Sequence, residues 1–179
     1  MKLLMLFSGL PGVGKTTISS QVASILGAEV VDIDDFKKTD VDPNLVTSQI
    51  DPPELRWSYY KKALGHVFGR FDQGISIAIM DEVFHLHSLR MQIEHLCSER
   101  LVSVLWVEVV CSYEVVSERL LSAPRQGHIL SSEEALRMYV MFEEIFEKFA
   151  RGSANHVVLH NEDVRNVDTL VEEILKRVT

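Results

Sequence analysis

Little cysteine is present, and its spacing suits neither a disulfide framework nor a zinc site. Cys97 and Cys111 are the only two cysteines in 179 residues, and the chain has no Cys-x-x-Cys pair. A small disulfide-rich secreted domain and a structural zinc domain are therefore excluded. We expect two reduced thiols in an intracellular protein.

Long hydrophobic runs are also missing. The apolar segment at residues 3–7 is far too short to span a bilayer. It continues into a glycine-rich loop without the small-residue pattern of a signal-peptide cleavage site. These absences predict a cytoplasmic protein with neither a membrane span nor an export signal.

Positive charge is scarcer than negative charge. The chain has 18 Lys and Arg against 26 Asp and Glu, a formal net charge of −8. Long-range attraction to phosphate backbones is therefore weak, which argues against duplex nucleic acid as a partner and leaves room only for a local basic pocket. The length and the ordinary composition predict one domain, residues 1–179, with a sizeable core.

Short apolar runs alternate with segments of helical periodicity along the whole chain. Alternating strands and helices are typical of an α/β fold with a parallel sheet. The clearest helix begins at Ser131-Ser132-Glu133-Glu134, which has the form of a capping box. Strands are expected at residues 2–8, 29–32, 75–80, 101–110 and 156–160.

Residues 9–16 read Gly-Leu-Pro-Gly-Val-Gly-Lys-Thr, which meets the phosphate-loop pattern G-x-x-x-x-G-K-[ST]. Glycines let backbone N–H groups point at phosphate oxygens, and the following helix adds the positive end of its dipole. Lys15 is expected to reach the β- and γ-phosphates, and the Thr16 hydroxyl is expected to hold Mg²⁺. The loop residues predicted to bind a nucleoside triphosphate are Gly9, Pro11, Gly12, Val13, Gly14, Lys15, Thr16 and Thr17.

Acidic residues follow the second and third expected strands, at the sheet edge where open α/β folds bind ligands. Asp34, in the acidic run at residues 30–36, can accept the proton of an attacking hydroxyl. Asp81 has the position of an acid that holds the magnesium shell. Strand-end loops are often acidic only because they are solvated. We interpret these acids as functional because a phosphate loop precedes them in the chain. His85 and His87 lack a third metal ligand and are interpreted as loop histidines.

Guanidinium groups are expected near a transferring phosphoryl group, because negative charge spreads over its oxygens. Arg119 ends the helix after the fourth strand, and Arg125 lies in a Pro/Gly segment, about residues 122–131, that suits a closing lid. Arg90 and Lys37 lie nearer the acceptor side. A surface salt bridge is the alternative role for each arginine.

Residues 37–73 go beyond a minimal sheet with crossovers, and we expect the acceptor to bind there. A polar loop is followed by Asp51-Pro52-Pro53-Glu54, which opens an aromatic-rich helix. Apolar residues fall on more than one face of this helix. Either the helix is buried on two sides or it lines an aromatic acceptor pocket.

These features resemble the small P-loop kinases that include polynucleotide kinase domains and zeta-type toxin kinases, over nearly the whole chain. The loop form Gly-x-Pro-Gly-x-Gly-Lys-Thr is similar to theirs, and so is the segment Asp34-Asp35-Phe36-Lys37. The resemblance implies that Asp34 is the general base and that Lys37 replaces an arginine that holds the acceptor.

Further positions match the same family in the same order. Asp81 resembles its acid after the third strand, and Arg90 approximates an arginine early in the next helix. Arg119 and Arg125 resemble its paired lid arginines, although they are spaced more widely here. The resemblance therefore implies that Arg119 binds the nucleotide, that Arg90 contacts the substrate and that Arg125 is catalytic.

The fold implied by the resemblance is a three-layer α/β/α P-loop fold with a five-stranded parallel sheet in the order 2-3-1-4-5. The predicted function is transfer of the γ-phosphate of ATP to a hydroxyl of a small molecule, with Mg²⁺ as cofactor. A polynucleotide 5′-hydroxyl kinase and a non-kinase switch that hydrolyses ATP are the alternatives. The sequence does not distinguish ATP from GTP as the phosphate donor, or a monomer from a homodimer.

Overall fold

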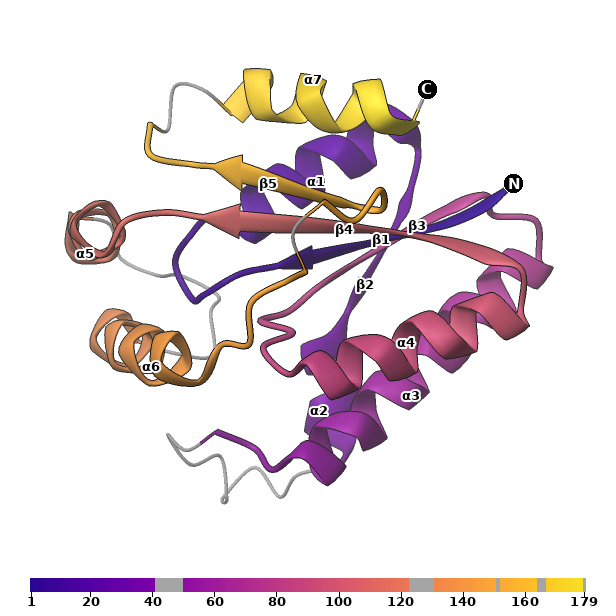
Figure 1. The fold of residues 1–179 in the computed structure, drawn as a ribbon, viewed down its shortest axis with the longest axis horizontal. Coiled ribbons are helices and arrows are strands. Elements are labelled where there is room, and N and C mark those ends of the chain that lie inside the picture. The colour runs from indigo at the N-terminus through magenta and orange to yellow at the C-terminus, as the bar shows by residue number, and fades with distance from the viewer. Residues whose placement is uncertain (41–49, 123–130, 151, 164–166, 179) are drawn as a thin grey trace.

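The computed structural model describes residues 1–40, 50–122, 131–150, 152–163 and 167–178 (Figure 1). Its middle layer is a parallel sheet in the order β2-β3-β1-β4-β5, which confirms the fold class and the strand order implied by the resemblance. The strands are β1 (Lys2–Ser8), β2 (Glu29–Asp32), β3 (Ile77–Asp81), β4 (Val102–Val110) and β5 (His156–His160).

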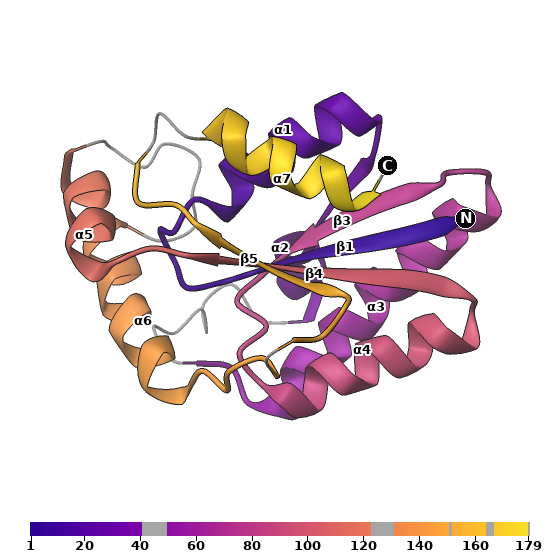
Figure 2. The same cartoon turned by 45° about the horizontal axis from the view of Figure 1, so that its top comes forward.

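Helices cover both faces of this sheet and the carboxyl ends of its strands. In Figures 1 and 2, α1 and α7 lie side by side on one face, α3 and α4 lie on the other, and α5 and α6 stand at the carboxyl ends. The helices are α1 (Lys15–Leu26), α2 (Ile33–Asp40), α3 (Pro53–Asp72), α4 (His87–Glu99), α5 (Tyr113–Ser122), α6 (Ser132–Ile145) and α7 (Val167–Val178).

The central strand β1 is buried on both faces, which explains its continuous apolar run. Met5 and Phe7 pack into the core beneath α1, whereas Leu4 and Leu6 pack beneath α3 and α4. All four side chains are fully buried. Because β1 lies between β3 and β4, the loop that follows it opens at the middle of the sheet edge.

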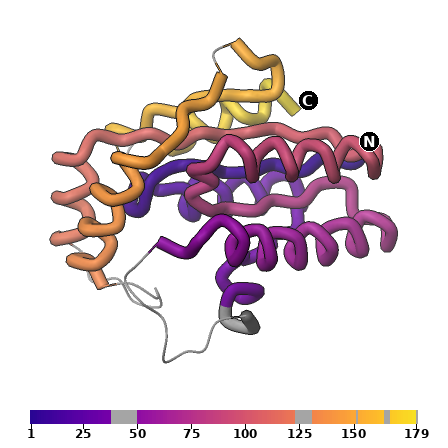
Figure 3. Tube along the Cα trace, turned by 60° about the horizontal axis from the view of Figure 1, so that its bottom comes forward, coloured from indigo at the N-terminus to yellow at the C-terminus, as the bar shows by residue number. Residues whose placement is uncertain are grey.

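Helix α2 was not expected, since its sequence is polar and acidic. Asp32 begins it by accepting a hydrogen bond from the N–H of Asp34 at 2.9 Å, which satisfies one of the free donors of the first turn. Figure 3 shows α2 beside the start of α3, on the same side of the sheet. Part of the predicted acceptor loop is therefore helical.

Helix α3 is the aromatic-rich helix of the acceptor region. Tyr59, Tyr60 and Phe71 are buried in the core, and Trp57 and Phe68 pack against it. The interpretation of a helix buried on more than one side therefore describes these rings better than an open aromatic pocket does. Within the part of the chain that the structure describes, no helix has the length and apolar character needed to cross a bilayer.

Candidate active site

The glycine-rich loop needs glycine because it passes very close to neighbouring elements. Gly9 has φ 147°, and a Cβ there would lie 2.3 Å from the carbonyl oxygen of Val109. Gly14 has φ 94°, and a Cβ there would lie 2.4 Å from Asn161 Nδ2. No side chain fits at either contact without displacing backbone or a buried amide. The loop is therefore held from below by β4 and from the side by the end of β5.

Lys15 folds back over this loop. Its Nζ donates hydrogen bonds to the carbonyl oxygens of Gly9 at 2.8 Å and Leu10 at 3.1 Å. Thr16 and Thr17 are exposed in the first turn of α1, whose N-terminus carries positive partial charge. The loop thus combines a cation, two hydroxyl groups and a helix N-terminus, which together suit a polyphosphate.

Asp81, at the end of β3, faces the start of α1. The hydroxyl of Ser19 donates a 3.1 Å hydrogen bond to Asp81 Oδ2. Burial raises the pKa of Asp81, while the charge of Lys15 and hydrogen bonds from Ser19 and Thr16 oppose that rise. A carboxylate and a threonine hydroxyl beside each other are ligands that Mg²⁺ accepts. Sequence reasoning missed Ser19. Its spacing of one helical turn after Thr16 is the feature that places it on the same side of α1 as Thr16.

Asp34 lies just beyond the strand that pairs with the one carrying Asp81. Strands β2 and β3 pair in register with Asp32 level with Asp81, and Asp34 follows two residues later in the first turn of α2. Asp34 is half-buried, whereas its neighbour Asp35 is exposed. The structure therefore brings the two sequence-predicted acids to adjacent strand ends at the side of the phosphate loop.

Sequence reasoning missed a buried arginine on the acceptor side. Arg56 of α3 is 3% exposed, and its Nη1 donates to Glu82 Oε1 at 3.1 Å. Its guanidinium lies over the ring of Phe142, 5.1 Å from the centroid. Burial acts to lower the pKa of Arg56, but the charge of Glu82 together with the interactions with Tyr60 and Tyr59 outweighs it, so the pKa of Arg56 is raised. Nothing in the local sequence of α3 marks this residue.

A second ion pair continues the same cluster. Lys37 of α2 lies 2.7 Å from Asp51 Oδ2, and the Tyr59 hydroxyl donates to the same oxygen at 3.3 Å. Arg56 Nε donates to the Asp51 carbonyl at 3.3 Å. We call Lys37, Asp51, Arg56 and Glu82 the paired-charge cluster. It extends from the helix that carries Asp34 to the strand end that carries Asp81.

The two histidines after β3 differ sharply. His85 is 2% exposed and packs edge-to-face on Phe142 at 5.0 Å between centroids. Its Nδ1 has no hydrogen-bond partner among the described residues. Burial, reinforced by the charge of Arg56, lowers the pKa of His85 to about 4. His87 is exposed and is the first residue of α4, so His85 is a buried loop histidine and His87 is a solvated helical one.

Arg90 has contacts of a different kind from those expected of an acceptor ligand. Its Nη1 donates to the Phe84 carbonyl at 2.7 Å and its Nη2 to the Glu147 carbonyl at 2.6 Å. Its guanidinium also stacks over Phe149 at 4.2 Å. These contacts fasten the segment after α6 to the end of β3. A substrate role for Arg90 stays a prediction.

Arg119, at the end of α5, lies on the far side of the loop from the acids. Its Nη1 is 3.5 Å from Cys111 Sγ, and its Nε and Nη2 are buried without a hydrogen-bond partner among the described residues. Such nitrogens are costly to bury, so the site favours an acceptor from a ligand. Arg125 and nearly all of the expected lid, residues 123–130, lie outside the described residues.

Asn161 is a further residue that sequence reasoning missed. It follows β5, is 4% exposed, and its Nδ2 donates to the Val13 carbonyl at 2.8 Å. The segment after β5 is thereby attached to the phosphate loop. Only the three-dimensional neighbourhood reveals this, because Asn161 belongs to no local motif.

Comparison with known proteins identifies a family and a fold. Residues 4–159 match the family described as AAA domain, whereas no curated protein matches the chain. A sugar kinase from Janibacter sp. HTCC2649 superposes with a TM-score of 0.73 at 22% identity, covering 99% of this chain and 94% of the other. A gluconokinase from Sinorhizobium meliloti 1021 gives 0.67 at 15% identity, covering 97% and 94%. At these identities the likeness concerns the fold.

Proposed function

Because this chain belongs to the AAA domain family and has the fold of the small P-loop kinases, we propose that it is an ATP-dependent phosphotransferase. It transfers the γ-phosphate to a hydroxyl of a small molecule. The observation that carries the proposal is the place of Asp81, which interacts with Lys15 of the phosphate loop and ends a strand paired with β2, the strand that leads into the helix turn of Asp34.

The donor half is built on the loop and α1. The backbone N–H groups of the loop and the helix N-terminus hold the phosphates, and Lys15 leaves the loop carbonyls to bind the β- and γ-phosphates. Thr16 and Asp81 would hold Mg²⁺, which neutralises phosphate charge when bound. Arg119 binds the nucleotide through its buried nitrogens, and Arg125 stabilises the transferred phosphoryl group.

The acceptor half is built around Asp34. Its carboxylate takes the proton of the acceptor hydroxyl as the oxygen attacks phosphorus, and the γ-phosphate leaves ADP for that oxygen. The first turn of α2 fixes Asp34 through its bond to Asp32. A base attached to a short capped helix is better oriented than one on an open loop.

The pairing of charges on the acceptor side of the site supports an uncharged acceptor molecule. Lys37 is paired with Asp51, and Arg56 is paired with Glu82. Both described cations of this cluster therefore already have a carboxylate partner, and an acceptor carrying its own carboxylate or phosphate would compete with it. The name of one similar structure, a sugar kinase, supports a hydroxyl-rich acceptor over a polynucleotide end.

The test is a search for phosphorylated products in a metabolite extract incubated with the protein, ATP and Mg²⁺. The extract is first divided by ion exchange into anionic, neutral and cationic pools. We expect mass spectrometry to find a compound that gains one phosphate in the neutral pool, with Lys15→Ala as the blank. A product found only in the anionic pool would contradict the uncharged acceptor. ATP consumption that no pool stimulates would instead favour the switch protein.

A further inference from the structure

A cavity of about 600 Å³ lies between the sheet and the segment that follows α6. Strands β4 and β5 form its floor, α6 and residues 146–149 and 152–153 form its roof, and Leu10 of the phosphate loop lies in its wall. Neighbouring side chains Val107 and Val157 pack in the core beneath α1. Because strand side chains alternate, Glu108 and His156 project to the opposite face. The cavity is therefore on the other side of the sheet from α1.

Glu108 and His156 form a buried polar pair in this cavity. Glu108 Oε2 lies 3.0 Å from His156 Nε2, and the two side chains are 17% and 8% exposed. The contact is not a well-formed hydrogen bond, since His156 Nε2 is a buried nitrogen without such a partner among the described residues. The pair therefore has unused hydrogen-bonding capacity. Glu108 also interacts through its charge with Arg90.

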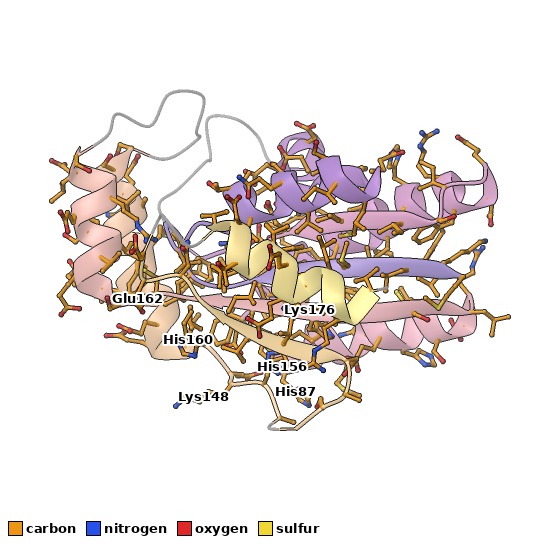
Figure 4. The ribbon with its side chains drawn as sticks, turned by 90° about the horizontal axis from the view of Figure 1, so that it is seen from above. His87, Lys148, His156, His160, Glu162 and Lys176 are labelled. Carbon is orange, nitrogen blue, oxygen red and sulfur yellow. The ribbon has the colours of Figure 1, made fainter. Side chains whose placement is uncertain are left out.

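The rings around this pair are fixed by stacking. Phe149 stacks on the imidazole of His156 with 4.3 Å between centroids and an interplanar angle of 14°. Arg90 lies over the same phenyl ring at 4.2 Å. Figure 4 labels His156 on β5 and Lys148 on the segment after α6, both at the lower edge of that view. Lys148 and Glu143 of the lining are both exposed. Glu108 is therefore the charged side chain of the inner lining, and its charge also acts on the neighbouring Arg90.

The cavity walls indicate the shape and charge of a ligand. Tyr139 and Phe146 offer aromatic surface, and Leu10 and Val110 add aliphatic surface, whereas the ring of Phe149 is already covered by His156 and Arg90. Flat rings bury well against such walls, and a carboxylate favours cationic N–H donors. The volume is in the range that small-molecule sites occupy.

We propose that this cavity is a binding site for a small, flat aromatic molecule that carries a cationic nitrogen group with N–H donors. The ring lies against Tyr139 and Phe146, and the nitrogen group donates to Glu108. Glu108 and the aromatic residues of this site are not those proposed to hold phosphate or the acceptor, and the cavity adjoins the phosphate loop at Leu10.

Benzamidine is a suitable probe because it joins a flat ring to an amidinium group. We expect calorimetric titration of the full chain to give one site with Kd on the order of 1 mM, and Glu108→Gln to weaken it about tenfold or more. Benzoate has the same ring with the opposite charge and should not bind. Glu118→Gln, an exposed position on α5, is the matched control and should bind benzamidine like the wild type.

Val158→Trp supplies a second variant that leaves Glu108 and His156 in place and fills the cavity from β5. It should abolish benzamidine binding while the thermal midpoint stays close to that of the wild type. The proposal is overturned if benzamidine does not bind, if benzoate binds equally well, or if binding is unchanged in both Glu108→Gln and Val158→Trp.

Discussion

Ser19 on α1 and Asp81 at the end of β3 are joined by a hydrogen bond of 3.1 Å. This bond links the helix that follows the phosphate loop to the acid at the neighbouring strand end. Burial raises the pKa of Asp81, and the hydrogen bond from Ser19 opposes this rise. Ser19 therefore favours the ionised carboxylate. Ser19 is thus a positioning residue for the metal side of the proposed site.

Ser19→Ala should therefore weaken the dependence of nucleotide binding on Mg²⁺. A lost hydrogen bond to a charged group is worth about 1.5–3 kcal/mol at most, so we expect the apparent Mg²⁺ affinity to fall by roughly tenfold. A Mg²⁺ titration of ATP binding measures this. Ser20→Ala, at an exposed position next to it, should have no effect. Equal Mg²⁺ curves for all three proteins would remove Ser19 from the site.

Asp34→Asn should lower kcat while leaving the binding of ATP unchanged. A positioned general base contributes about 10²–10⁴-fold to rate, and this substitution removes the base without changing its size. Asp35→Asn is the matched control, because Asp35 is exposed on the same helix turn. Steady-state kinetics with the acceptor found by mass spectrometry decides the question. Phosphotransfer within a few-fold of wild type would disprove the assignment of Asp34.

Asp81→Asn should stabilise the protein in the absence of Mg²⁺ and abolish Mg²⁺-dependent activity. Since burial raises the pKa of Asp81, the folded state holds this proton more tightly than the unfolded chain does. The stability given by the protonated form is complete below the ordinary Asp pKa of about 3.9. It is lost as the pH rises through the raised pKa, so the gain from Asn is largest at neutral pH.

Urea unfolding of both proteins from pH 7 downward measures this gain. Asp72→Asn is the control of opposite sign, because a hydrogen bond and the charge of Lys2 lower the pKa of the exposed Asp72. Asp72→Asn should therefore not raise the free energy of unfolding at pH 7. A less stable Asp81→Asn protein at pH 7 would show that the carboxylate is needed for folding.

His85→Phe should reduce the loss of stability in mild acid. The pKa of His85 falls from 6.5 to about 4 on burial, so the folded state resists its protonation. The stability from neutral His85 is present above about pH 6.5 and is lost as the pH falls toward 4. The loss attributable to one group is at most about 1.4 kcal/mol per pH unit.

Urea unfolding at several pH values between 7 and 4 measures how steeply the free energy of unfolding changes with pH. We expect His85→Phe to have a flatter profile than the wild type, since a ring against Phe142 is kept and the titrating group is removed. His87→Phe changes an exposed histidine and should keep the wild-type slope. Parallel profiles for the wild type and His85→Phe would mean that another group governs acid sensitivity.

The sequence predicts those elements of the fold that are determined by residues close together in the chain. The apolar run of β1 indicates a strand buried on both faces, and the structure confirms it. The capping box before α6 is also confirmed, with Glu134 N–H donating to Ser131 Oγ at 3.2 Å and Ser131 N–H donating to Glu134 Oε2 at 2.9 Å. Both signals involve residues that are neighbours in the chain, so pattern and structure agree.

Contacts between distant residues explain what the sequence does not predict. Arg56 and Glu82 are 26 residues apart, and each alone is an ordinary charged residue. Their pairing depends on how α3 packs against the end of β3, which periodicity does not specify. The helix α2 was missed for a different reason, because acidic residues near a strand end suit a solvated loop equally well.

Asn161 and Val13 are 148 residues apart, yet their 2.8 Å hydrogen bond shapes the first loop of the chain. During synthesis the loop emerges from the ribosome early, whereas its support emerges only with β5 and the residues that follow. Incomplete chains therefore lack one side of the nucleotide site. Their capacity to capture nucleotide should appear only after β5 and Asn161 have left the ribosome.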